Sequence, residues 1–174
     1  MTDQVVIVGA GHGAGQVVAT LRQQQYAGRI VLIGEESWLP YQRPPLSKKF
    51  LAGDMPAERL FVKPPSFYED PAIDLRLGTR VEAIDRKARS VRTADGETIR
   101  YTDLVLATGS RVRRLELPGS DLAGIHYLRG IDDVNAIRDD LEPAERIVII
   151  GAGYIGLEVA AVASELGKAG TVVE

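Results

Sequence analysis

The sequence contains no cysteine. A disulfide-stapled fold, a zinc or iron–sulfur site with thiolate ligands and a thiol nucleophile are therefore excluded within these 174 residues. No apolar run approaches the roughly 20 residues that a membrane-spanning helix needs. The first residues lead directly into a short apolar segment, without the basic region of a signal peptide. We therefore expect a cytoplasmic protein with no membrane partner.

Neither sign of charge dominates the composition. The formal net charge is -3, which gives no electrostatic reason to expect nucleic acid as a partner. The basic residues Arg111, Arg113 and Arg114 have acidic residues nearby, and we interpret them as a solvated loop. The two histidines, His12 and His126, are far apart in sequence, so we expect no metal site. A hydrophobic fraction of 45% is enough to fill the core of a globular domain.

One pattern occurs twice. The segments 5–22 and 147–166 each begin with four β-branched residues, continue through a glycine-rich turn and end in an amphipathic helical pattern. A further apolar strand follows each copy, at residues 30–33 and 171–173. The uninterrupted apolarity of these strands predicts burial on both faces, as in a parallel sheet. We expect an α/β protein with two Rossmann-like units, the second truncated because the chain stops at the tip of a strand.

The glycine-rich turns match the dinucleotide-binding fingerprint. The first reads G-x-G-x-x-A and the second G-x-G-x-x-G, and the positions concerned are Gly9, Gly11, Ala14, Gly151, Gly153 and Gly156. The first glycine allows a sharp turn, the second lets backbone approach a pyrophosphate, and a small third residue lets the helix lie close to the strand. The helix N-terminus then faces the phosphates. One such match is weak evidence, but two in matching contexts predict two bound dinucleotides.

An acidic residue follows each second strand. Glu35 and Glu174 stand where a carboxylate accepts hydrogen bonds from the hydroxyls of an adenosine ribose. An acid at Glu174 repels a 2′-phosphate, which favours NADH over NADPH.

The sequence between the two copies differs in composition and in the length of its predicted elements. Residues 35–72 are rich in proline and predict ordered loops with short helices. Short strands are expected at 81–85, 90–93, 98–101 and 104–107, with a hairpin at Asp95-Gly96, and a helix is expected at 132–141. We divide the chain into residues 1–115, which include the first fingerprint; 116–145, a connection and helix; and 146–174, the start of a domain that carries the second fingerprint.

Five segments in order resemble one family. They read VVIVGAGHGAGQ, LPYQRPPLSKKFLAG, LVLATGS, YLRGIDD and IGAGYIGLEVAA, and together they extend over nearly the whole chain. They resemble the FAD-dependent NADH:ferredoxin reductases of the rubredoxin, putidaredoxin and biphenyl-dioxygenase reductase type, which are relatives of apoptosis-inducing factor. The resemblance implies the FAD/NAD(P)-binding fold of the glutathione-reductase architecture, with FAD at the first fingerprint and NADH at the second. Residues 1–115 are then the N-terminal part of an FAD-binding domain, and residues 146–174 are the start of an NADH-binding domain.

The resemblance also implies roles for individual residues. Those expected to bind FAD are Gly9, Gly11, Gly13, Ala14, Glu35, Arg43, Lys48, Val81, Ala107, Thr108, Gly109 and Arg129. Those expected to serve NADH are Gly151, Gly153, Ile155, Gly156, Glu158 and Glu174.

Lys48 and Glu158 have two possible interpretations. From the residues alone, Lys48 is a solvated amine, and Glu158 is an acid favoured by the helix dipole. The resemblance implies instead a catalytic ion pair beside the flavin N5 and the nicotinamide C4, where the lysine stabilises the anion formed on hydride arrival.

The missing cysteine bears on the reaction as well. Disulfide reductases of this architecture have a cysteine pair in the region where this chain has Arg43-Pro44-Pro45-Leu46-Ser47-Lys48. Electrons from NADH must then leave the flavin directly. The resemblance implies transfer to a [2Fe–2S] ferredoxin or a rubredoxin that supplies an oxygenase. Two alternatives remain open at this point: an NADH-sensing flavoprotein of the apoptosis-inducing-factor type, and an NADH oxidase or the reductase module of nitrite reductase.

Overall fold

The computed structural model describes residues 3–174 and divides them into two units. The first unit comprises residues 3–42 and 61–110, and the second comprises Arg43–Leu60 and Arg111–Glu174. The proline-rich segment Arg43–Leu60 thus belongs to the same unit as the second glycine-rich turn. The division expected from the sequence has its boundaries at residues 115 and 145, and it therefore assigns this segment to the first domain.

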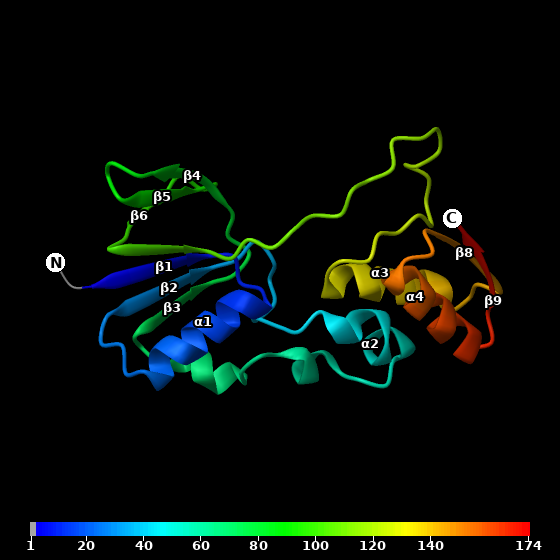
Figure 1. Cartoon of the computed structure of the whole chain (residues 1–174), viewed down its shortest axis with the longest axis horizontal. Helices are drawn as coiled ribbons and strands as arrows, with labels where there is room; N and C mark the ends of the chain where they lie inside the picture. The colour runs from blue at the N-terminus through cyan, green and yellow to red at the C-terminus, as the bar shows by residue number, and fades with distance from the viewer. Residues whose placement is uncertain (1–2) are drawn as a thin grey trace. The chain divides into compact units, whose positions relative to one another are not determined.

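A parallel sheet forms the centre of the first unit (Figure 1). Its strands lie in the order β3 (Ile73–Arg76), β2 (Arg29–Ile33), β1 (Gln4–Val8) and β7 (Asp103–Leu106). Val8 pairs with Ile33 on one side and with Leu106 on the other, so the three strands end at the same edge. The strands expected at 30–33 and 104–107 correspond to β2 and β7, whereas β3, only four residues long, was not predicted as a separate strand.

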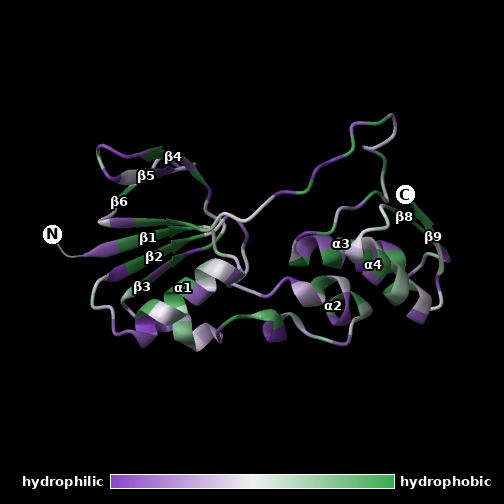
Figure 2. Ribbon diagram, viewed as in Figure 1, coloured by the Kyte–Doolittle hydropathy of each residue, from purple (hydrophilic) through white to green (hydrophobic). Residues whose placement is uncertain are grey.

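Both faces of this sheet are covered (Figures 1 and 2). Helix α1 (His12–Gln23) buries Ala14 and Val18 against one face. On the other face lies an antiparallel sheet of β4 (Val81–Asp85), β5 (Ser90–Thr93) and β6 (Thr98–Arg100), whose Val91 and Ile99 pack against Val6. The hairpin predicted at Asp95-Gly96 joins β5 to β6, with Gly96 at φ +90°. The prediction that β1 and β2 are buried on both faces is confirmed. A short 3-10 helix, η3 (Pro65–Glu69), completes this unit.

The second unit places helices beside a two-stranded parallel sheet (Figure 1). Its elements are η1 (Pro44–Ser47), α2 (Lys49–Ala52), η2 (Ala57–Leu60), α3 (Ile131–Leu141), β8 (Arg146–Ile150), α4 (Tyr154–Glu165) and β9 (Ala169–Val173). Helix α4 covers one face of the sheet and buries Val162 and Ala163.

The strands β8 and β9 differ from their counterparts in the first unit. Val148 and Ile150 are 65% and 69% exposed, because no described element of this unit covers the second face of the sheet. The expectation of burial on both faces is therefore wrong for β8 and β9 as the structure describes them. Among the described helices, none combines the length and the apolarity required to cross a membrane.

Candidate functional site

The first glycine-rich turn joins β1 to α1 under tight packing. Gly9 has φ +102°, and its N–H donates to the carbonyl of Ile33 at the end of β2 (2.8 Å). A Cβ at Gly9 would collide with the backbone of Ala107 and Thr108, so only glycine fits there. The turn and the end of β7 are therefore in contact, which brings three of the predicted FAD-binding residues together.

The opposite side of the same turn is open. Gly11 is the N-cap of α1, and a Cβ built at Gly11 or Gly13 would meet no described heavy atom within 4 Å apart from its chain neighbours. Ala14, by contrast, is fully buried against the sheet. The turn thus leaves space in front of the helix N-terminus, where N–H groups without helical partners can bind an anion. The residues present fit a pyrophosphate.

The second turn repeats this geometry. Gly151 has φ +103° and donates its N–H to the carbonyl of Val173 (2.7 Å), as Gly9 does to Ile33. Gly153 is the N-cap of α4 and has open space where a Cβ would stand. A Cβ at Gly156 would collide with the carbonyl oxygen of Gly151, so the helix approaches the turn too closely for any larger residue. The two turns are alike in their hydrogen bonds as well as in their sequences.

The two acidic residues are not at equivalent positions. Gly34 is the residue that follows the paired strand in the first unit, and Glu174 is the residue that does so in the second. Glu35 therefore lies one residue beyond the position of Glu174. The glycine is required because a Cβ at Gly34 would collide with the side chain of Ala10 in the turn.

The surroundings of the two carboxylates differ accordingly. Glu174 accepts a hydrogen bond from the N–H of Ala152 (2.5 Å), so its carboxylate lies at the second glycine-rich turn. Glu35 is exposed and forms an ion pair with Arg80 (3.0 Å), the residue before β4. Val81, the first residue of β4, is half-buried against the sheet, and Gly109 turns the chain with φ +68° after β7.

The second unit brings Lys48 and Glu158 together. The Lys48 Nζ lies 2.8 Å from the Glu158 Oε1, so the expected ion pair is present. Ser47 donates its hydroxyl to the other carboxylate oxygen of Glu158 (2.5 Å). The Lys48 ammonium and, to a smaller extent, the Ser47 hydroxyl lower the pKa of Glu158, which is therefore ionised at neutral pH.

Arg43 and Arg129, both expected along the cofactor, also lie together. Arg43 Nη1 donates to the carbonyl oxygen of Arg129 (2.6 Å). The backbone N–H groups of Arg129 and Gly130 donate to the carboxylate of Asp133, which caps the start of α3. Ile155, in the first turn of α4, is 54% exposed and contributes an apolar surface next to the second glycine-rich turn.

Comparisons with known proteins agree with this geometry. The family model described as pyridine nucleotide-disulphide oxidoreductase matches residues 3–174. The chain belongs to this family. A ferredoxin–NAD(P)+ reductase from Sphingomonas is 48% identical over 100% of this chain and 43% of its own length. A rubredoxin–NAD+ reductase from Pseudomonas putida is 43% identical over 98% of this chain and 44% of its own length.

Solved structures show the same likeness. The ferredoxin reductase for the CYP199A2 system from Rhodopseudomonas palustris matches with a TM-score of 0.92 and 45% identity, over 98% of this chain and 42% of that one. The chain thus spans less than half the length of these relatives. The predicted fold class is confirmed. The two turns predicted two dinucleotides and the resemblance implied that they are FAD and NADH; FAD and a pyridine nucleotide are the cofactors of this oxidoreductase family.

This member of the pyridine nucleotide-disulphide oxidoreductases has no cysteine to form the redox disulphide. In the region where disulphide reductases have that pair, this chain has η1 with Ser47, followed by Lys48. Ser47 and Asp133 were missed from the sequence. Asp133 could have been found from the spacing of Gly130 to Asp133, which is that of a capping box, but no local signal marks Ser47 as a partner of Glu158.

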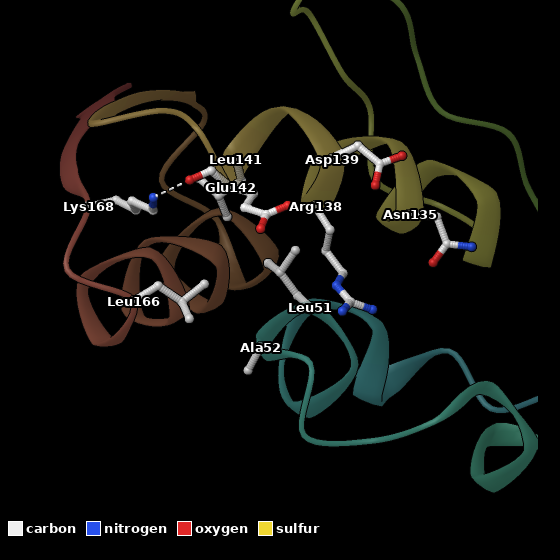
Figure 3. Close-up of a pocket in the computed structure, with 9 residues that line it drawn as sticks. All are labelled: Leu51, Ala52, Asn135, Arg138, Asp139, Leu141, Glu142, Leu166 and Lys168. Carbon is white, nitrogen blue, oxygen red and sulfur yellow. Dashed lines mark hydrogen bonds between the residues drawn. The ribbon is translucent and has the colours of Figure 1, made fainter.

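One pocket of the second unit lies apart from these residues (Figure 3). It has a volume of about 520 Å³ and is lined by α2, α3 and the residues after α4. Lys168 donates to the carbonyl oxygen of Glu142 at its wall (2.8 Å). None of the predicted cofactor-binding residues lines this pocket. Within residues 3–174, no cluster of three or more His, Asp or Glu side chains could hold a metal ion.

Proposed function

We propose that the complete product of the gene that encodes this chain is a flavoprotein reductase. It takes hydride from NADH and passes single electrons to a [2Fe–2S] ferredoxin or a rubredoxin, which supplies an oxygenase. The observation that carries the proposal is the Lys48–Glu158 ion pair, whose lysine lies in the region where disulphide reductases of this family have cysteines. Because the chain has no cysteine, electrons from the flavin have no disulphide to reduce within these residues.

The names of the relatives support this acceptor class. They include a ferredoxin–NAD+ reductase component of an anthranilate 1,2-dioxygenase system from Burkholderia cepacia, 47% identical over 99% of this chain. A solved complex of putidaredoxin reductase with putidaredoxin matches this chain with a TM-score of 0.90 at 40% identity. We place the reaction in the cytoplasm, where NADH is freely available.

In this proposal each unit has a separate task. The open side of the first turn, at Gly11 and Gly13, holds the FAD pyrophosphate, with Glu35 at the adenosine ribose. The second turn, at Gly153, holds the NADH pyrophosphate, and Glu174 accepts hydrogen bonds from its ribose hydroxyls. Bound FAD would supply the conversion of one hydride into two single-electron transfers.

The chain's own contribution to the reaction is electrostatic. Glu158 fixes the ammonium of Lys48 through an ion pair, and this ammonium supplies a positive charge at the place where negative charge develops. Arg43 and Arg129, which lie on the same unit as Lys48 and are joined by a hydrogen bond, orient the FAD.

The test uses the complete gene product. Under anaerobic conditions, stoichiometric NADH should bleach the flavin absorbance near the visible maximum, and an added ferredoxin or rubredoxin should then allow steady reduction of cytochrome c. A purified protein that binds no flavin, or a flavin that NADH leaves oxidised, would overturn the proposal. Bleaching by NADH followed by rapid oxygen consumption, without transfer to either protein acceptor, would contradict the proposed acceptor alone.

A further inference from the structure

The carboxylate of Glu158 is held at both oxygens by two consecutive residues. The Ser47 hydroxyl donates to Oε2 at 2.5 Å, and the Lys48 ammonium contacts Oε1 at 2.8 Å. Because each oxygen has a different partner, the plane of the carboxylate is fixed on both sides. Rotating it to improve one contact would lengthen the other.

The two partners differ in how firmly they are held. Ser47 is 4% exposed and lies at the end of η1, which begins with two prolines that restrict its backbone. The side chain of Lys48 is 50% exposed and has four rotatable bonds between its backbone and its charge. The rigid partner of Glu158 is therefore Ser47, and the mobile one is Lys48.

The ammonium of Lys48 has a donor to spare. Of its three N–H groups, one is directed to Glu158 Oε1 and one to the carbonyl oxygen of Pro44 (3.2 Å). No third partner is present among residues 3–174. The direction of the remaining N–H depends on the positions of the two acceptors, the Glu158 carboxylate and the Pro44 carbonyl oxygen.

We propose that Ser47 is a positioning residue for the reductase reaction: its buried hydroxyl fixes the Glu158 carboxylate, and this carboxylate directs the free N–H of Lys48 to the reacting atoms. The inference rests on the proposed function and adds to it the role of one residue, Ser47. The pKa of Glu158, lowered by both partners, is consistent with this arrangement, since an ionised carboxylate accepts the serine hydrogen bond most strongly.

The test compares Ser47→Ala with Ser47→Thr in the complete gene product. Anaerobic stopped-flow mixing with NADH measures the limiting rate of flavin reduction and the NADH concentration that gives half of it. Ser47→Ala should lower the limiting rate about tenfold, because it removes a hydrogen bond to a charged group. The half-saturating concentration and the flavin content should stay within about twofold of wild type. Ser47→Thr retains the hydroxyl and should stay within about threefold of the wild-type rate.

The same serine substitution in a Glu158→Ala background separates positioning from a general structural role. If Ser47 acts through Glu158, Ser47→Ala should cause no further loss once the carboxylate is absent. A tenfold loss that persists in this background would overturn the inference, as would a wild-type rate in the single variant. A slow Ser47→Thr protein with normal flavin content would contradict it independently of whether Ser47→Ala folds. These results differ from a failure of the proposed function, in which NADH would not reduce the wild-type flavin at all.

Discussion

Replacing Gly9 or Gly11 by alanine separates the folding role of the first turn from its cofactor role. At Gly9 the backbone has φ +102°, which costs a residue with a Cβ about 1–2 kcal/mol. The new Cβ would lie 2.6 Å from the carbonyl carbon of Ala107, 0.8 Å short of the 3.4 Å at which ordinary contact begins. Strain and collision together should lower the free energy of unfolding by about 3 kcal/mol. We therefore expect Gly9→Ala to be defective in folding.

Gly11→Ala should behave in the opposite way. Its backbone is extended, and its Cβ would enter open space, so the free energy of unfolding should change by no more than about 0.5 kcal/mol. The same Cβ would occupy the place where backbone must approach a pyrophosphate, and FAD affinity should fall about tenfold, or about 1.4 kcal/mol. Urea unfolding measures the first quantity, and titration of the flavin-free gene product with FAD measures the second. Equal loss of stability in both variants, with FAD affinity unchanged in Gly11→Ala, would refute this reasoning.

Three further substitutions test other parts of the structure. Lys48→Ala should slow flavin reduction by NADH at least tenfold in stopped-flow experiments while FAD affinity changes less than about threefold, and unchanged kinetics would remove the catalytic role of the lysine. Gly156→Ala should lower the free energy of unfolding, measured in urea, by about 3 kcal/mol, because its Cβ meets the Gly151 carbonyl. Gly153→Ala should instead weaken NADH binding and leave the free energy of unfolding nearly unchanged. A Gly153→Ala protein less stable than Gly156→Ala would contradict the packing described. Burial raises the pKa of Tyr68 to about 12, and its hydroxyl has no partner among the described residues, so Tyr68→Phe should be stable to within about 0.5 kcal/mol at pH 7. Because the raised pKa favours the neutral phenol in the folded state, wild-type stability should fall as the pH rises from 10 towards 12, and the phenylalanine variant should lose that part of the dependence.

The sequence was sufficient for those parts of the fold that depend on neighbouring residues. Runs of β-branched residues predicted β1, β2 and β8, and the glycine spacing predicted both turns. Asp95-Gly96 predicted a hairpin for the same reason, since two residues determine the turn. The order of the strands in the sheet was not accessible in this way, because β3 and β7 come from sequence distant from the strands they join.

The candidate site was less predictable where it depends on contacts between distant segments. That Ser47 holds Glu158 cannot be read from either residue's surroundings in sequence, because 111 positions separate them. The offset between Glu35 and Glu174 was hidden for a different reason. In the first unit a Cβ at Gly34 would collide with Ala10, and such a packing constraint leaves no mark in the fingerprint itself.

The difference between the two fingerprints has a physical cause in the approach of the helix. At the third position the first unit has Ala14, which is fully buried, and the second has Gly156, whose position leaves no room for a Cβ beside the Gly151 carbonyl. The space for a pyrophosphate is open in both turns, at Gly11 and at Gly153. The size of the third residue therefore depends on how closely the helix packs on its strand, and it does not indicate which nucleotide the turn binds. We therefore expect the choice between FAD and NADH to depend on other residues. The carboxylates after the second strands are one such difference, because Glu35 is paired with Arg80 in the first unit whereas Glu174 accepts from the N–H of Ala152 in the second.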